Sequence, residues 1–399
     1  MLKMLNMFHT RKWPIALDIG SDSVKLLQMQ RVGSTVMVSA CGRWQAPTPA
    51  EADAEHRRKL IATAVRDILR SEAFSGRDVI SSLSCSQLNI KNVRLPHMPE
   101  SELAEAVKWE AEERLNLNRE ADELNYLNAG QVRQGNETRD EIIMLAATSE
   151  VVNDHLGLLS EIGLRPKHID AEPVALFRSF ERFLRRRADE QAVSVIADVG
   201  QSATRLVVAR GRQIIFIKHI GIGGRTFSEA AAKQLNLSFK EACDLRGRIM
   251  QDCTEQTYGG RRRDDESAPT PQAVAREASS INWTVYDAVR GEVEALAREI
   301  ALCLRYCSVT FRGLRPEQIT ATGGQAYDPA VVKLLAEHLN IPCVMGQPLK
   351  GIDVSGVDLG GDRRSMMAEW AVCAGLAMQN ANVDYEVQED EDGESRLSA

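Results

Sequence analysis

The sequence predicts an α/β protein in which two related halves flank a cleft. Segments with strand-like and helix-like apolar patterns alternate along the chain, as they do in α/β folds. The stretch ALDIGSDSVKLL is also echoed by ADVGQSATRLVV, so that Asp18 matches Asp198 and Gly20 matches Gly200 at a distance of 180 residues. A turn that occurs twice in matching surroundings indicates a duplicated core.

The composition indicates a folded protein and argues against a nucleic-acid-binding function. The chain has 399 residues, of which 44% are hydrophobic and 26% are charged, and this suits a sizeable core spread over two or three domains. Most of its net charge of −7 arises from residue 384 onward, where seven acids accompany Arg396. The rest of the chain is close to neutral, so we expect no nucleic-acid partner.

Cysteine usage and hydropathy predict the compartment. The eight cysteines are scattered and lack metal-binding spacing, which indicates free thiols in a reducing environment. No apolar run reaches the roughly 20 residues that span a bilayer, and the first residues lack the order of a signal peptide. We therefore expect a cytoplasmic protein whose membrane association is indirect, through a partner.

The first half of the chain is predicted to contain a compact β-α-β-β-α unit at residues 84–165. The helix over 56–71 has an apolar stripe at helical spacing, and Gly163 gives the helix over 151–162 a typical end. The predicted strands cover 15–29, 35–43, 79–95, 124–132 and 141–148, and a further helix covers 101–117.

The second half returns to strands and adds longer helices. Ser238 and Glu241 have the spacing of a capping box, and Asp328 with Pro329 begins another helix. The other predicted elements are a strand over LRPKHIDAE, a helix from Pro173, strands over 193–210 and 213–220, helices over 225–237, 281–309 and 365–378, a strand at ITATGGQ, a flexible insert at 252–280 and a disordered acidic tail.

The doubled turn has the composition of a phosphate-binding hairpin. Glycine lets the backbone approach an anion closely, and turn amides with nearby hydroxyls form a phosphate nest. Asp18 and Asp198 end their strands just before the turns, where carboxylates can hold water around Mg²⁺. Lys25 either supplies a point charge to the phosphates or points to solvent. Two such hairpins facing each other would clamp the phosphate tail of a nucleotide.

A common strand-end turn is the alternative explanation for a single Asp-x-Gly. The second copy, with further glycine turns at 221–224 and 323–324, favours phosphate binding. The sequence has no GxxxxGK[ST] loop, no GxGxxG that opens a helix, and neither HExxH nor GxSxG. The doubled turn is therefore the strongest functional signal that the residues give.

Five segments, in chain order, resemble the actin-like ATPase superfamily. They are ALDIGSDSVKLLQM, ADVGQSATRLVV, IGIGGRTFSEA, LSFKEACDLR and ITATGGQA. Within the superfamily, residues 93–170 are similar to the PilM-type pilus assembly proteins, which are relatives of the cell-division protein FtsA. The phosphate turns identify only the superfamily, whereas the block that ends in GLRPKHID is more specific.

The resemblance implies an actin-like ATPase fold with two ribonuclease-H-like cores around a nucleotide cleft. It also implies an inserted β-α-β-β-α subdomain and a smaller cap. The implied boundaries are a flexible N-terminus at 1–13, the first core at 14–83 and 166–190, the inserted subdomain at 84–165, the second core at 191–222 and 316–362, the cap at 223–315, a C-terminal helix at 363–380 and a disordered tail at 381–399.

The resemblance further implies ATP and Mg²⁺ as ligands. Asp18 and Asp198 would hold the metal through water, and Asp170 and Glu172 lie where the superfamily often keeps a residue that positions the attacking water. The implied nucleotide-binding residues are Asp18, Gly20, Ser21, Ser23, Lys25, Asp198, Gly200, Ser202, Thr204, Gly223, Gly224, Arg246, Gly323 and Gly324. The sequence does not allow us to assign any single residue as the catalytic base, so we expect at most a slow ATPase.

One segment departs from the family pattern. The family commonly has Ala-Glu-x-x-Lys on the helix that touches the ribose, and this chain has Ala-Cys-Asp-Leu-Arg at residues 242–246. Cys243 therefore stands at the position of the acid, and Arg246 stands at the position of the lysine. The ribose contact is the part of the implied site that this departure puts in question.

For function, the resemblance implies a cytoplasmic ATP-binding adapter at the inner face of the inner membrane, in a type IV pilus assembly complex. Its partners would be the N-terminal tail of a PilN-like bitopic protein, held in a groove between the inserted subdomain and the first core, and the motor ATPases of pilus assembly. Self-association is a further option. The alternatives are an FtsA-like division filament protein, a sugar-kinase-like enzyme and the cytoplasmic part of a type II secretion protein.

Overall fold

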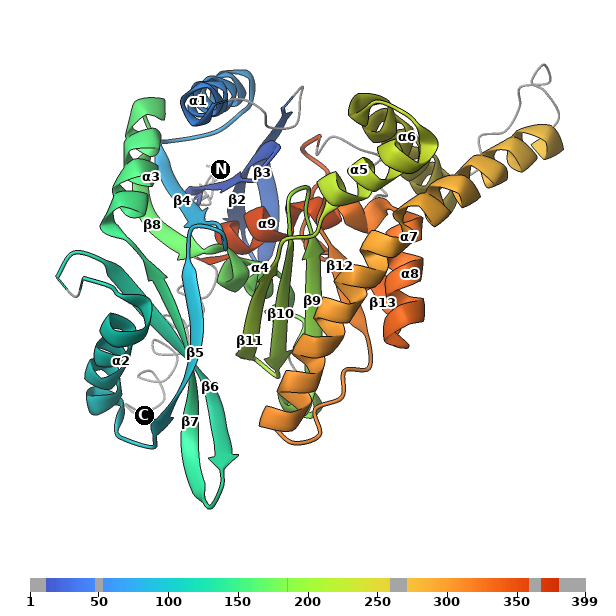
Figure 1. Ribbon diagram of the computed structural model, residues 1–399. Helices are drawn as coiled ribbons and strands as arrows, with labels where there is room; N and C mark the ends of the chain where they lie inside the picture. The colour runs from blue at the N-terminus through green and yellow to red at the C-terminus, as the bar shows by residue number, and fades with distance from the viewer. Residues whose placement is uncertain are drawn as a thin grey trace, which may run out of the picture.

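The computed structural model describes residues 12–46, 53–118, 120–184, 186–258, 271–358 and 367–379 (Figure 1). The disorder predicted for 381–399 falls outside these residues, as does most of the flexible N-terminus predicted at 1–13. The centre of the insert predicted to be flexible at 252–280 lies outside them as well.

Two five-stranded sheets with the same topology form the centre of the described part of the chain. The first has the order β3-β2-β1-β4-β8, and the second has the order β11-β10-β9-β12-β13. In each sheet, three antiparallel strands are followed by two parallel strands, so the predicted duplication of an α/β core is confirmed. The strands are β1 (Ile15–Ile19), β2 (Ser23–Val32), β3 (Thr35–Gln45), β4 (Asp78–Leu83), β8 (Arg165–Ala171), β9 (Val193–Val199), β10 (Thr204–Arg210), β11 (Gln213–Ile220), β12 (Ile319–Thr322) and β13 (Cys343–Met345).

Helices cover the sheets, and both predicted helix caps are present. Ser238 N and Glu241 N each bond to the other residue's side chain, and Asp328 accepts from Ala330 N at 3.0 Å. The α-helices are α1 (Ala54–Ser71), α2 (Glu100–Leu115), α3 (Ser149–Ile162), α4 (Glu172–Glu181), α5 (Gly224–Leu235), α6 (Phe239–Tyr258), α7 (Pro271–Thr310), α8 (Pro329–Leu339) and α9 (Ala371–Ala377), with short 3-10 segments at Arg187–Gln191, Gly324–Tyr327 and Ala368–Trp370.

The first sheet is buried on both faces because its strands are apolar on both sides. Ile15 and Leu17 of β1 pack with α1 and α3, whereas Ala16 between them packs on the opposite face with α9. Helix α4 packs along α9, and both helices lie between the two sheets (Figure 1). These two helices are therefore the layer that the two cores share.

The inserted subdomain is a three-stranded sheet, β5-β7-β6, with α2 on one face. Its strands are β5 (Asn89–Pro96), β6 (Glu123–Gln134) and β7 (Glu137–Ala147). Ile142 and Met144 face α2, whereas Ile143 and Leu145 join the core of the second half, where β6 and β7 contact β11. The inserted subdomain therefore rests on the second core.

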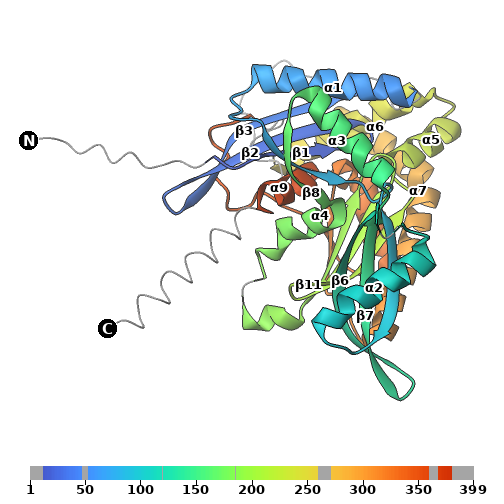
Figure 2. The same cartoon turned by 90° about the vertical axis from the view of Figure 1, so that its left-hand side faces the viewer.

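The unit predicted at 84–165 is too long at its C-terminal end. Helix α3 supplies Leu158, Leu159 and Ile162 to the apolar core between the first sheet and α1. Figure 2 shows α3 beside α1 and away from α2. The apolar stripe of α3 has the same spacing whichever sheet it covers, so the sequence could not distinguish the two placements.

Stability is expected to fall as the pH drops below about 6.5, in part through His155. Its Nε2 lies 2.8 Å from Ser81 Oγ in the buried space between α3 and β4, and burial lowers the pKa of His155. The unfolded chain therefore takes up this proton at a higher pH than the folded chain does, and acid favours unfolding. A melting-temperature series from about pH 7.5 to about pH 5.5 should show the fall, and His155→Gln should reduce it.

The control for this series is His56→Gln, because His56 is exposed on α1. That variant should keep the pH dependence of the unaltered chain. An equal fall in the His155→Gln and unaltered proteins would show that another group causes the loss of stability.

Candidate nucleotide site

The two matched sequences form two matched hairpin turns. Gly20 N donates to Ser23 O at 2.8 Å between β1 and β2, and Gly200 N donates to Ala203 O at 3.0 Å between β9 and β10. Each turn stands at the same place in its own sheet, since β1 and β9 are both the central strands of the two sheets. The repeat seen in the sequence is therefore a repeat of local structure.

At the first hairpin, Lys25 is buried and lies opposite Asp18. Its Nζ is 3.2 Å from Asp18 Oδ2 and 3.4 Å from Ser23 Oγ, and the residue is 7% exposed. Burial disfavours the ammonium charge, but nearby carboxylates, Asp18 foremost, outweigh it and raise the pKa of Lys25. Lys25 therefore does not point to solvent, and it remains a fixed charge beside the turn. Arg57 of α1 holds the turn itself by donating to Gly20 O at 2.7 Å and to Ser21 O at 3.0 Å.

At the second hairpin, Arg205 lies at the position that matches Lys25. It pairs with Asp198 across the strands, and its Nη1 also lies 3.0 Å from Glu172 Oε1 at the start of α4. Thr322 Oγ1 of β12 donates to Asp198 Oδ1 at 2.9 Å. Arg205 was not among the residues predicted for the site, although its match to Lys25 in the repeat is a signal that could have identified it.

Glu172 is buried at the start of α4, beside Arg205 of the second hairpin. Burial raises its pKa, Arg205 opposes this rise, and the charges of Asp18 and Asp198 add to it. The charges of both hairpin aspartates therefore act on the same buried carboxylate. Cys85 N donates to Glu172 Oε2 at 2.9 Å, so both oxygens of this side chain have partners.

Asp170, the other acid predicted to position the attacking water, pairs with Arg178 of α4. Its Oδ2 lies 2.7 Å from Nη1 of Arg178, which also donates to Gly375 O of α9 at 3.1 Å. Asp170 therefore ties β8 to α4, and Arg178 in turn ties α4 to α9. Of the two predicted acids, Glu172 is the one that lies with the hairpin aspartates.

The remaining predicted glycines gather around the second hairpin. Gly224 N donates to Gly200 O at 2.9 Å, and a Cβ on Gly223 would lie 2.7 Å from the same oxygen. Gly323 has φ +83°, and a Cβ there would lie 2.6 Å from Asp198 Oδ1. Gly324, by contrast, has open space around its Cβ position. Gly223, Gly224 and Gly323 therefore lie in close contact with the hairpin that carries Asp198.

The hydroxyl residues of the turns divide into two groups. Ser23 and Thr204 are buried, and Thr204 Oγ1 donates to Ile222 O at 2.7 Å. Ser21 is half-buried and Ser202 is exposed. Ser21 and Ser202 are therefore the two turn hydroxyls that remain accessible to a ligand.

Arg246 is buried, and its guanidinium bonds to other parts of the protein. It is 2% exposed, and its guanidinium bonds to Gly224 O at 3.0 Å, Gln325 Oε1 at 2.7 Å and Asp328 Oδ2 at 2.6 Å. These bonds tie α6 to the start of α5 and to the segment before α8. Cys243, one turn earlier on α6, is half-buried.

The hairpin aspartates and Glu172 are not free to act as direct ligands of a magnesium ion as they stand. Mg²⁺ takes oxygen ligands in octahedral geometry and is usually held by one or two carboxylates and by waters. Here Asp198 and Glu172 have partners on both oxygens, and Asp18 pairs with Lys25. Within the described part of the chain, no three acidic, histidine or cysteine side chains gather so as to hold a metal.

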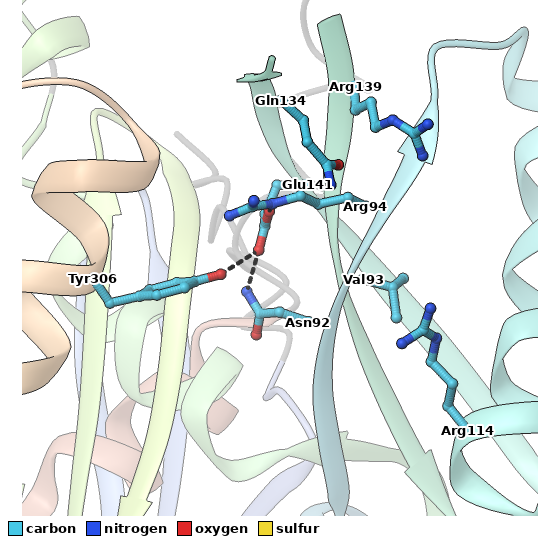
Figure 3. Close-up of a pocket in the computed structure, with 8 residues that line it drawn as sticks. All are labelled: Asn92, Val93, Arg94, Arg114, Gln134, Arg139, Glu141 and Tyr306. Atoms are coloured by element: carbon cyan, nitrogen blue, oxygen red, sulfur yellow. Dashed lines mark hydrogen bonds and ion pairs between the residues drawn. The ribbon is translucent and has the colours of Figure 1, made fainter. Parts of the chain in front are cut away.

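The inserted subdomain has two further cavities among the described residues. One, of about 700 Å³, lies beside the start of α2 and is lined by His97, Met98, Pro99, Glu100, Leu103, Tyr126, Asn128 and Asp140. The other, of about 360 Å³, faces α7 and includes Tyr306 (Figure 3). Neither is lined by a residue of the first core, so the groove predicted between that core and the inserted subdomain is not one of these two.

The smaller cavity lies where the inserted subdomain is fastened to the second core. Figure 3 shows Tyr306 of α7 reaching Glu141 of β7, and its hydroxyl donates to Glu141 Oε1 at 2.7 Å. Gln213 of β11 also donates to Asn128 O of β6 at 2.7 Å. These bonds link the inserted sheet to α7 and to strand β11, and β11 pairs with β10 of the second hairpin.

Two sheets of equal order, each with a matched glycine hairpin at the centre, define an actin-like ATPase fold. The chain belongs to the family of type IV pilus assembly proteins PilM, because the model of that family matches residues 16–256. The model of the cell division protein FtsA matches residues 195–361.

Solved structures agree on the fold. A PilM-PilN type IV pilus biogenesis complex superimposes with a TM-score of 0.70 at 23% identity, covering 92% of this chain and 98% of that chain. The ethanolamine utilization protein EutJ from Carboxydothermus hydrogenoformans gives a TM-score of 0.51 at 11% identity, covering 92% of this chain and 89% of that chain. Among the described residues, no helix is both long and apolar enough to cross a membrane.

Proposed function

We propose that this chain is an ATP-binding adapter of the type IV pilus assembly complex, located at the inner face of the inner membrane. It binds the triphosphate between its two hairpins and the N-terminal cytoplasmic tail of a PilN-like membrane protein on its inserted subdomain. Family membership supports the pilus role. The observation that carries the nucleotide site is the pair of matched turns, closed by Gly20 and Gly200, which follow the central strands that carry Asp18 and Asp198.

The contacts favour binding over rapid hydrolysis. A general base needs an accessible lone pair within reach of the attacking water. Both oxygens of Glu172 have partners, and Asp170 is paired with Arg178. The chain therefore acts mainly as a scaffold whose state depends on nucleotide, with slow ATP turnover at most.

The inserted subdomain suits a peptide partner. Its larger cavity has an apolar wall, which includes Met98 and Tyr126, beside the buried carboxylate of Asp140. The inserted sheet contacts β11, so a peptide bound to the inserted subdomain would act on the second core through these direct contacts. The proposal also includes contacts of this chain with the motor ATPases of pilus assembly, and self-association of the chain.

The first test is titration calorimetry with ATP in a Mg²⁺ buffer, followed by titration with a peptide of the partner's N-terminal tail. We expect both ligands to bind. We expect Met98→Gln to weaken the affinity for the peptide by about tenfold, because the substitution removes an apolar contact. The matched control is Met345→Gln, which changes another half-buried methionine on β13 of the second core. Absence of peptide binding with and without ATP would overturn the adapter role.

The FtsA match over residues 195–361 favours one second candidate, a filament-forming protein. Filaments would sediment at high speed when ATP is added, whereas the adapter would stay in the supernatant. Sedimentation of the full chain therefore separates the two functions.

A further inference from the structure

The second hairpin carries a buried cationic side chain, that of Arg205. Arg205 pairs with Asp198 of its own hairpin and bridges to Glu172 of α4, with Nη1 and Oε1 3.0 Å apart. Lys25, its counterpart on the first hairpin, pairs with Asp18. The two hairpins therefore match in backbone, but Arg205 reaches a second carboxylate outside its own turn.

The guanidinium of Arg205 lies against the turn that would meet the phosphates. A Cβ added to Gly200 would lie 3.0 Å from Arg205 Nη2 and 3.1 Å from Ala203 O. The absence of a side chain at position 200 is what leaves room for the guanidinium. A phosphate bound over this turn would therefore come within reach of Arg205.

The arginine also occupies the oxygens that a metal would need. Asp198 Oδ2 and Glu172 Oε1 face Arg205, Asp198 Oδ1 accepts from Thr322, and Glu172 Oε2 accepts from Cys85 N. A magnesium ion could coordinate these carboxylates directly only after Arg205 had left two buried acids. Burial disfavours the charge of Arg205, but Asp198 and Glu172 outweigh it and raise its pKa, so the guanidinium stays charged.

We propose that Arg205 takes the place of the magnesium ion at the second hairpin, so that this chain binds the triphosphate of ATP without a divalent metal. The inference rests on the nucleotide site proposed above and adds which fixed cation meets the phosphate oxygens there. A guanidinium presents a planar fork of donors that suits phosphate oxygens. Asp198 and Glu172 aim that fork, and Lys25 supplies the second fixed charge from the opposite hairpin.

The test is to measure ATP affinity by calorimetry with the full unaltered chain, once with MgCl₂ and once with EDTA. We expect the two dissociation constants to agree within about threefold. Arg205→Gln should make binding depend on metal, with affinity at least about tenfold weaker in EDTA than in MgCl₂. The matched control is Arg212→Gln, an exposed arginine at the β10–β11 turn that pairs with Glu181, and it should behave as the unaltered chain does.

The possible results separate this inference from the function on which it rests. ATP binding by the unaltered chain that is lost in EDTA overturns the role of Arg205 and leaves the nucleotide site intact. No binding in either buffer overturns both. The comparison of buffers needs no variant, so it stands even if Arg205→Gln fails to fold. If Arg205→Gln melts like the unaltered chain and binds ATP equally in both buffers, the inference also fails.

Discussion

Replacing Gly200 with valine is expected to weaken ATP binding by at least about thirtyfold, a loss of about 2 kcal/mol. The new Cβ would lie 3.0 Å from Arg205 Nη2 and 3.1 Å from Ala203 O, and the two methyl groups would extend over the turn. They would fill the space through which a phosphate approaches, and they would displace Arg205. Position 200 is not among the described residues with positive φ, so valine there meets no left-handed backbone strain.

The measurement is calorimetric titration with ATP, with a thermal melt to show that the variant is folded. Gly221→Val is the matched control, because a Cβ at Gly221 meets nothing within 4 Å and the residue lies on the loop just beyond β11. Gly20→Val should also lose affinity, since its Cβ would lie 3.2 Å from Ser23 O in the equivalent turn. Full affinity in a folded Gly200→Val protein would place the phosphates away from the second hairpin.

The sequence predicts the duplicated frame well because the signal for it is local. A tight turn needs glycine and short polar residues at fixed offsets, and such a pattern is visible without knowing what packs against it. The same is true of the capping box of Ser238 and Glu241 and of Asp328 before α8. Helix α3 was assigned to the wrong unit, because its partners Leu17 and Ile61 are distant in sequence.

The site itself could be predicted only in part. The two turns and their aspartates follow from the repeat, but the partners of those aspartates depend on long side chains that reach across strands. Lys25 could equally have faced solvent, and the bridge from Arg205 to Glu172 joins residues of β10 and α4. One tertiary feature did have a sequence signal, since the run IIMLAA in β7 is apolar on both faces, as expected of a sheet covered on both sides.

Replacing Gly375 with alanine is expected to lower the free energy of unfolding by about 3 kcal/mol or more. Gly375 lies in the middle of α9, and a Cβ there would lie 1.7 Å from the carbonyl oxygen of Ala175 in α4. The obstacle is backbone, so it cannot be relieved by turning a side chain. The two helices would have to separate, and they form the layer shared by the two cores.

The matched control for Gly375→Ala has the opposite expected sign. Gly291 lies within α7 with nothing within 4 Å of its Cβ position, so Gly291→Ala should raise the free energy of unfolding by about 0.5–1 kcal/mol through helix propensity alone. Urea denaturation of both variants beside the unaltered chain measures the two effects. Because a glycine inside a helix is itself unfavourable, its presence at 375 is explained by the close approach of α4. Equal stabilisation in both variants would mean that α4 and α9 do not pack at this distance, and that the two cores are held together in another way.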